Sequence, residues 1–240
     1  MFSFVSSPRH TGLTHSSIVP EGLSPIRWRG KHDSRAGVPD SVEYLYRRLA
    51  PVYGLLYGVT LEHGRRQAMA RLAPVRGESI LEIGVGTGLS ALNYPPGCHV
   101  VAVDLSAEML ERARIRLARK AVRHVTLCRM DAARLAFPDA QFDAVYAPYV
   151  VNVVPDPIRV GREMLRVCRP LGRLVLLNHF DVADGERHRF DDLIGHLAAR
   201  AGVNWHVGLR EFLRDTGLTA LSVERVNRPR VSSVVVCRKP

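Results

Sequence analysis

The fold of this 240-residue chain is decided by the stretch LEIGVGTG at residues 81–88. The apolar run SILEI at 79–83 predicts a short buried β-strand, and Gly84, Gly86 and Gly88 follow it. Glycine lets a backbone turn sharply and approach a ligand closely. Ligands of parallel α/β sheets bind at the carboxyl ends of the strands, where this loop would lie. The stretch therefore predicts the first strand of such a sheet and a ligand-binding loop.

Outward from this loop, β-rich runs alternate with helical patterns. Further strands are expected at 99–104, 125–130, 142–147 and 173–179, and helices from Ser106, from Asp156-Pro157 and over roughly 186–200. Ser106 is a good N-cap, and a capping acid followed by proline is the expected order at a helix start. The β-rich segments 220–226 and 232–237 predict an antiparallel hairpin at a sheet edge. The pattern predicts an α/β fold, with a Rossmann-like, doubly wound, mostly parallel seven-stranded sheet and an antiparallel C-terminal hairpin.

The N-terminal part of the chain lacks this alternation. Residues 1–40 are rich in Ser, Pro, Gly and His without hydrophobic periodicity, which predicts a flexible leader: a plain extension, the product of a misplaced start codon, or a transit peptide. Apolar residues at helical spacing over 42–56 predict a helix that Pro51 kinks, with Arg47 and Arg48 off its apolar stripe. A second helix is expected at 61–72. Residues 41–240 are therefore expected to form one domain.

The charge of the chain is unusual. Basic residues number 34 and acidic ones 23, which leaves a net charge of +11, and all basic residues except Lys31, Lys120 and Lys239 are Arg. Codon usage in a GC-rich genome would also explain the excess of arginine over lysine. Codon usage does not create the net positive charge, which favours an anionic partner. No apolar run is long enough to span a bilayer, and no signal-peptide h-region is visible. Four widely spaced cysteines without a CxxC pair indicate reduced thiols in a cytoplasm, and no metal site is expected.

Two acidic residues suggest what the glycine loop binds. Asp104 ends the second expected strand, where a carboxylate accepts both hydroxyls of a ribose. Glu82 precedes the loop, where a carboxylate would crowd a pyrophosphate but suit an ammonium group. Leu89 stands where a GxGxxG dinucleotide motif needs its third glycine. A ribose, an adenine and a cationic amino-acid tail together describe S-adenosylmethionine, in preference to a nicotinamide dinucleotide.

Four segments in this order resemble the successive motifs of the class I S-adenosylmethionine-dependent methyltransferases: LEIGVGTG, VVAVDLSAEML, RMDAARLAFPDAQFDAV and LRVCRPLGRLVLLN. Leu171 departs from the usual RPGGR, which should affect only a turn. The resemblance implies that Glu82 holds the amino group of the cofactor and that Asp104 binds its ribose. It implies the remaining cofactor-binding residues as well: Gly84, Gly86, Thr87 and Gly88 at the methionine moiety, Leu105 and Met109 against the adenine, and Asp131 and Ala132 at the adenine edge.

Nucleic acid is not expected as the substrate. Methylation at cytosine C5 needs a cysteine after the fourth strand, and none of the four cysteines lies there. Methylation of an exocyclic amine typically uses a [DN]-P-P-[YF] turn, whereas this chain has Tyr146-Ala147-Pro148-Tyr149 at that place. The turn lacks the acid or amide that would hold the amine hydrogens.

A narrower resemblance points to a lipid substrate. LYRRLAPVYGLLYGVTLEHGRRQAM, GVGTGLS, YVVNVVPDP and NHF together resemble the soluble bacterial phosphatidylethanolamine N-methyltransferases. That family implies stepwise N-methylation toward phosphatidylcholine at the cytoplasmic membrane surface. It also implies that the N-terminal amphipathic helices, residues 41–72, act as a lid and dock on anionic lipid, and that Tyr53 reaches the cofactor carboxylate. Gly54 stands where the family has Asp. A C- or O-methyltransferase for a quinone precursor or another small hydrophobic acceptor shares the core motifs and remains an alternative, as does a non-catalytic binding module.

The catalytic candidates are Tyr46, Tyr149 and His179. Tyrosine faces attract methylated ammonium groups, and their hydroxyls orient an incoming amine. A primary alkylamine keeps its proton up to about pH 10 and must lose it before it attacks. His179, just after the fifth strand, is the candidate base with Asn178 as its orienter, although desolvation of the amine could replace a base.

Overall fold

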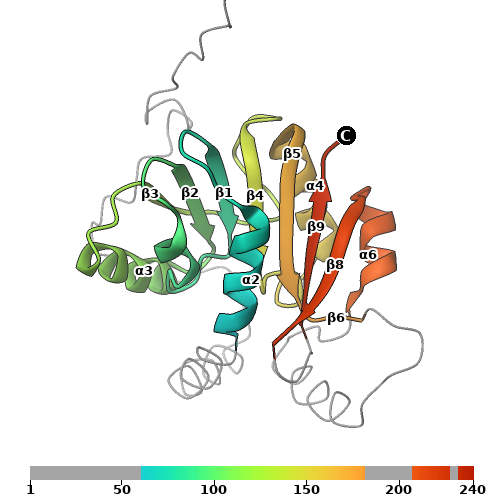
Figure 1. Cartoon of the computed structure of the whole chain (residues 1–240), viewed down its shortest axis with the longest axis horizontal. Helices are drawn as coiled ribbons and strands as arrows, with labels where there is room; N and C mark the ends of the chain where they lie inside the picture. The colour runs from blue at the N-terminus through green and yellow to red at the C-terminus, as the bar shows by residue number, and fades with distance from the viewer. Residues whose placement is uncertain (1–60, 182–206, 228–231) are drawn as a thin grey trace, which may run out of the picture.

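A seven-stranded sheet forms the centre of the molecule (Figure 1). The computed structural model describes residues 61–181, 207–227 and 232–240. The strands follow the order β3-β2-β1-β4-β5-β9-β8; the first five are parallel to one another, and β9 is antiparallel to both β5 and β8. Their bounds are Ser79–Ile83 (β1), His99–Asp104 (β2), Val125–Arg129 (β3), Phe142–Pro148 (β4), Cys168–Asn178 (β5), Ala220–Val226 (β8) and Ser232–Arg238 (β9). The predicted fold class is confirmed.

The helices begin where the sequence places their caps. Ser106 caps α3 (Ala107–Arg119) by accepting a hydrogen bond of 3.2 Å from the Met109 N–H, and Asp156 caps α4 (Pro157–Val167) by accepting one of 2.9 Å from Arg159. The helix expected at 61–72 is α2 (Glu62–Leu72). Four elements were not predicted: the 3-10 helix η1 (Ser90–Asn93), the helix α6 (Leu209–Thr216), and the strands β6 (Phe180–Asp181) and β7 (Val207–Gly208), which form a parallel pair.

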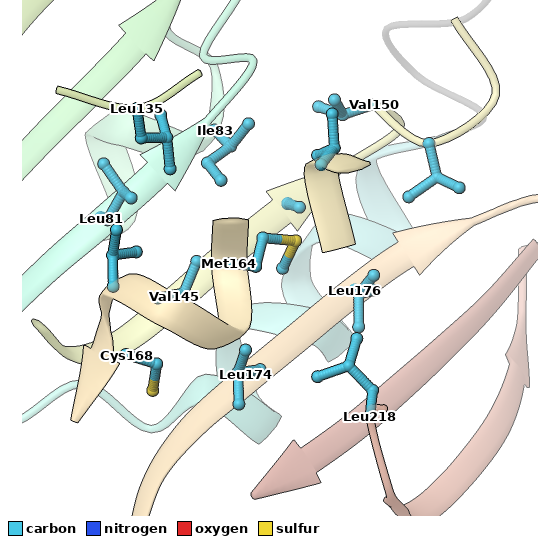
Figure 2. Packing of buried hydrophobic residues seen from close by; sticks show 14 of the residues in the cluster. Leu81, Ile83, Leu135, Val145, Val150, Met164, Cys168, Leu174, Leu176 and Leu218 are labelled. Atoms are coloured by element: carbon cyan, nitrogen blue, oxygen red, sulfur yellow. The ribbon is translucent and has the colours of Figure 1, made fainter. Parts of the chain in front are cut away.

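Alternate residues of each strand pack on opposite faces of the sheet. Leu81, Val145 and Leu174 face α4 and α6, where Met164 and Phe212 complete the larger core cluster (Figure 2). The intervening residues, Ile80, Ala144 and Val175, pack with Ala68 and Leu72 of α2 on the other face. Helix α3 covers the β2 end of that second face through Leu110 and Leu117. The sheet is therefore covered on both faces, as the doubly wound pattern predicts.

The fifth strand is longer than expected. It begins at Cys168 and ends at Asn178, so that His179 is the first residue beyond it. Leu171, the departure from the family motif, is exposed and has a φ of 62° near the amino end of β5. That position is at the edge of the sheet opposite to the glycine loop, which agrees with an effect on a turn alone.

Several predicted features lie outside the described residues: the leader 1–40, the helix over 42–56 with Pro51, the helix over 186–200, and the candidates Tyr46, Tyr53 and Gly54. Among the helices that the structure does describe, none is long and apolar enough to cross a membrane.

Candidate active site

The glycine loop turns at the carboxyl end of β1 with two different uses of glycine. Gly84 has a φ of 70°, and a Cβ atom there would meet Val150 Cγ2 at 2.2 Å, so packing excludes any side chain. Gly86 has a φ of 53°, but a Cβ atom there would have no atom of the described residues within 4 Å. The loop is therefore packed against the β4 side at Gly84 and open at Gly86, where a ligand has room.

Asp104 holds the loop in place from the end of β2. Its Oδ2 accepts a hydrogen bond of 2.8 Å from the Gly86 N–H, and its Oδ1 accepts one of 2.9 Å from the Ser106 N–H. A carboxylate offers about four acceptor positions, so both oxygens keep a lone pair for further donors. The half-buried carboxylate both shapes the loop and remains able to accept the two hydroxyls of a ribose.

The residues predicted to meet the adenine flank Asp104. Leu105 is 61% exposed although it is a large apolar side chain, and Met109 in the first turn of α3 is half-buried. Beyond β3, Asp131 is exposed and its Oδ1 accepts a hydrogen bond of 2.9 Å from the Ala133 N–H, while Ala132 packs against the larger core cluster. An exposed apolar side chain between two acids suits a flat ring with polar edges.

Glu82 is fully buried on the face that α2 covers. The Ser90 hydroxyl donates a short hydrogen bond to its Oε1, whereas Oε2 has no hydrogen-bond partner within the described part of the chain. Burial raises the pKa of the Glu82 carboxyl to about 7, against the lowering effect of the Ser90 and Tyr94 hydroxyls and of the Arg65 charge. A buried carboxylate oxygen without a donor is costly, so a cationic donor from a ligand would stabilise it.

Two tyrosines share this buried region with Glu82. Tyr146 stands beside Glu82 in the β1–β4 register and is fully buried, and Tyr94 follows η1. The Tyr146 hydroxyl has no hydrogen-bond partner among the residues described, whereas the Tyr94 hydroxyl is near enough to Glu82 to lower the pKa of its carboxyl. Tyr146 therefore lies in the core, beside the predicted cofactor end of the site.

Thr87 is fastened to α3. Its hydroxyl and its carbonyl oxygen each accept a hydrogen bond from Arg116 Nη1, at 2.8 Å and 2.7 Å. The contact fixes the far side of the glycine loop. Taken together, the open space at Gly86, the unpaired Glu82 Oε2 and the spare lone pairs of Asp104 fit the amino-acid tail and ribose of S-adenosylmethionine.

Tyr149 and His179, both predicted to be catalytic, lie close together just beyond the carboxyl ends of β4 and β5. Their ring centroids are 5.7 Å apart, with 39° between the ring planes. His179 is 8% exposed and follows β5, while Tyr149 follows β4 with a φ of 58°. Burial raises the pKa of the Tyr149 hydroxyl, so it is protonated at neutral pH.

Asn152, and not Asn178, forms hydrogen bonds with His179, and it does so through the His179 backbone. The Asn152 amide pairs with the His179 backbone, donating to its carbonyl oxygen at 3.0 Å and accepting from its N–H at 3.2 Å. Both amide atoms of Asn178 lack a hydrogen-bond partner in the part of the chain that the structure describes. The prediction for Asn178 is therefore wrong, because its side chain leaves the strand on the opposite face from that of His179.

Two further residues that contact Tyr149 and His179 were not predicted, Asn227 and Ser232. Ser232 Oγ lies 3.1 Å from His179 Nδ1, and Asn227 contacts both Ser232 and Tyr149. A signal existed for Ser232: an antiparallel last strand beside the fifth strand places its first residues next to the end of that strand. No short motif marks Asn227.

The comparisons with known proteins agree with this geometry. A family model described as "Methyltransferase domain" matches residues 81–176. A phosphatidylethanolamine N-methyltransferase of Cereibacter sphaeroides is 44% identical over 168 residues, which cover 70% of this chain and 81% of that protein. The chain belongs to the S-adenosylmethionine-dependent methyltransferases. Its cofactor is S-adenosylmethionine, and the resemblance seen in the sequence motifs is confirmed.

Other relatives of this methyltransferase differ in their acceptors. A demethylmenaquinone methyltransferase of Clavibacter sepedonicus is 43% identical over 106 residues, covering 44% of this chain and 42% of that protein. Phosphoethanolamine N-methyltransferase 2 of Haemonchus contortus, solved with S-adenosyl-L-methionine, has a TM-score of 0.67 at 19% identity and covers 85% of this chain and 61% of that one. This structural likeness shows the fold alone.

Proposed function

We propose that this methyltransferase N-methylates phosphatidylethanolamine and its mono- and dimethyl forms, toward phosphatidylcholine, at the cytoplasmic membrane surface. The observation that carries the proposal is the 44% identity, over 70% of the chain, to the phosphatidylethanolamine N-methyltransferase of Cereibacter sphaeroides. The Tyr149–His179 pair supports it, because an aromatic ring and an imidazole suit an amine that must lose a proton.

One half of the site would hold S-adenosylmethionine by the charged and polar ends of the cofactor. We call it the cofactor half; it consists of Tyr53, Glu82, the glycine loop 84–88, Asp104, Leu105, Met109, Asp131 and Ala132. Glu82 would accept hydrogen bonds from the amino group, and Asp104 would accept them from the ribose hydroxyls. Leu105 and Met109 would contact the adenine face, with Asp131 and Ala132 at its edge, and the glycine loop would follow the methionine moiety. Tyr53, outside the described residues, would reach the carboxylate. The cofactor would supply a methyl group on a sulfonium: a well-placed neutral amine attacks the methyl carbon in line, the S–CH3 bond breaks, and the thioether leaves.

The other half of the site would bind the amine of the acceptor and remove its proton. We call it the acceptor half; its catalytic candidates are Tyr46, Tyr149 and His179. A phospholipid amine holds its proton up to about pH 10, so it arrives as an ammonium ion. His179 would accept that proton, and the Tyr149 ring would stabilise the ammonium by cation–π attraction, worth about 0.5–2 kcal/mol. Tyr46 would complete the pocket from the N-terminal segment. The enclosed position of His179 also keeps water from competing for the methyl group.

Net charge would bring the enzyme to its substrate. The chain carries +11, and an anionic leaflet attracts nearby basic residues by about 1 kcal/mol each. On α2, Arg66 is 72% exposed, whereas Arg65 is buried beside Glu62 and is not available to a membrane. We therefore propose that residues 41–72 contact the membrane through the exposed face of α2 and the segment before it, with the domain peripheral to the bilayer.

A second candidate acceptor is a quinone precursor. The observation that favours it is the 43% identity, over 106 residues, to the demethylmenaquinone methyltransferase of Clavibacter sepedonicus. C- or O-methylation of such a ring would use the same cofactor half. The identity covers a smaller part of the chain, 44%, which makes this the weaker proposal.

Radiolabelled methyl transfer distinguishes the two acceptors. The full chain is incubated with labelled S-adenosylmethionine and anionic vesicles that contain phosphatidylethanolamine, and the lipids are separated by thin-layer chromatography. We expect label in mono-, di- or trimethylated lipid, and less of it at high salt. Vesicles without phosphatidylethanolamine are the control. In a parallel reaction that contains demethylmenaquinone, label in the methylated quinone with no labelled lipid would replace the lipid proposal by the quinone one.

A further inference from the structure

One asparagine connects the start of α2 to the Tyr149–His179 pair. Asn227 follows β8, has a φ of 72° and is 5% exposed. The Gly64 N–H donates a hydrogen bond of 2.8 Å to its Oδ1. Because an N–H donates only to an acceptor, this bond fixes which amide atom is the oxygen. The amide nitrogen must therefore point the other way, toward the sheet.

The amide nitrogen of Asn227 uses both of its protons on the acceptor half. Nδ2 donates to the Tyr149 hydroxyl at 3.1 Å and to Ser232 Oγ at 2.9 Å. Ser232, which is fully buried, then contacts His179 Nδ1 at 3.1 Å. We call Gly64, Tyr149, His179, Asn227 and Ser232 the Asn227 network. In this network the Asn227 side chain contacts Tyr149 directly and His179 through Ser232.

Tyr149 needs such support because its backbone is strained. A φ of 58° is the left-handed region, which costs a tyrosine free energy that surrounding contacts must outweigh. Its hydroxyl accepts from Asn227 and donates to the Leu61 carbonyl oxygen at 3.4 Å, at the start of α2. The ring is therefore held at its hydroxyl end from two directions.

The backbone of α2 at Gly64 packs closely against the side chains of Asn227 and Tyr149. A Cβ atom on Gly64 would lie 2.8 Å from both Asn227 Oδ1 and the Tyr149 hydroxyl oxygen. Only glycine allows the helix backbone to come this near. The helix that follows the N-terminal segment is thus joined to the acceptor half through the same amide.

We propose that Asn227 is a positioning residue for methyl transfer: its two N–H groups hold Tyr149 directly and His179 through Ser232. The inference rests on the proposed roles of Tyr149 and His179. It adds to them the requirement for two donors at position 227, which neither a carboxylate nor an apolar side chain supplies.

Two substitutions separate positioning from simple attachment of α2. Asn227→Asp keeps an oxygen for the Gly64 N–H but loses both donors, and Asn227→Gly suits the positive φ but removes the amide. We expect both to lower kcat at least about tenfold and to leave the cofactor Kd within about twofold. The matched control is the same change at an exposed asparagine, Asn93→Asp, with kcat within about twofold of wild type. Wild-type kcat and pH profile in folded Asn227→Asp would overturn the inference.

Nuclear magnetic resonance tests the network without any acceptor. The ring ¹⁵N signals of His179 are followed in the wild type and in Ser232→Ala, with circular dichroism confirming the fold. We expect the Nδ1 signal to move, because its contact with Ser232 Oγ is lost. An unchanged Nδ1 signal would overturn the inference. A wild type that methylates no phosphatidylethanolamine, with the expected change in the His179 Nδ1 signal, would overturn the proposed function alone.

Discussion

The cofactor half and the acceptor half of the candidate active site are held together by different kinds of contact. The cofactor half consists of residues close in sequence, held by hydrogen bonds such as that of the Gly86 N–H to the Asp104 carboxylate, 18 residues away. The acceptor half joins Gly64, Tyr149, His179 and Asn227 from four separate elements through side-chain hydrogen bonds. A short motif can encode the first arrangement, whereas the second exists only after the sheet has formed. The two halves should therefore respond differently to substitution.

The largest effect is expected at Gly84. Gly84→Ala would place a Cβ atom 2.2 Å from Val150 Cγ2 at a positive φ, so the loop must move. We expect the free energy of unfolding to fall by about 3 kcal/mol or more and cofactor binding to become undetectable by calorimetry. Gly77→Ala is the matched control, with a φ of 88° and open space, and should cost about 1 kcal/mol with cofactor binding retained. Equal effects of the two variants would contradict the packing of the loop.

The second-largest effect is expected at Asp104, because its carboxylate holds the glycine loop and would also bind the ribose of the cofactor. Asp104→Ala is expected to weaken S-adenosylmethionine binding by at least about tenfold, measured by calorimetry. Asp156→Ala removes a similar carboxylate that accepts a backbone hydrogen bond, but at the start of α4. It should lower stability by about 1 kcal/mol and leave cofactor affinity unchanged. Unchanged affinity in Asp104→Ala would remove the ribose assignment.

Glu82 makes the cofactor half sensitive to pH. Its raised pKa, about 7, means that the folded protein binds this proton more tightly than the unfolded chain does. Its contribution to stability therefore falls as pH rises from about 4.5 to about 7 and is constant above that. The ionised form binds an ammonium group, so we expect the cofactor Kd to decrease about fivefold between about pH 6 and 7.5.

Calorimetry in buffers of different ionisation enthalpy would detect the proton released on binding below pH 7. Glu82→Gln should bind the cofactor more weakly and lose this pH dependence. A Kd in the wild type that is constant over the same range would show that Glu82 is not the partner of the amino group.

The smallest effect is expected at the Tyr149 hydroxyl. Tyr149→Phe keeps the ring but removes one acceptor of Asn227, and a single hydrogen bond contributes about 1 kcal/mol. Turnover should fall about threefold with no change in cofactor affinity, measured by methyl transfer at saturating cofactor. A larger change in cofactor Kd than in turnover would place Tyr149 in the cofactor half.

The same division explains what the sequence could predict. The strands of the large sheet, the caps Ser106 and Asp156, and the glycine loop follow from local patterns, and all are found, whereas the order of the strands in the sheet was not predicted. Helix α6 carries the usual signals, apolar residues at Leu209, Phe212 and Leu213 and a Gly217 stop, but it is short and was missed. Asn227 and Asn152 could not be predicted, because their roles depend on partners 78 and 27 residues away in the sequence.

Cofactor Kd and turnover at saturating cofactor, measured together on Gly86→Ala and His179→Ala, test the division most directly. A methyl group on Gly86 would occupy space that the account gives to the cofactor. We predict that Gly86→Ala raises the cofactor Kd at least about tenfold and keeps turnover near that of the wild type. His179→Ala should keep Kd and lose turnover by about a hundredfold. Parallel losses of both quantities in both variants would contradict the division of the site into two halves.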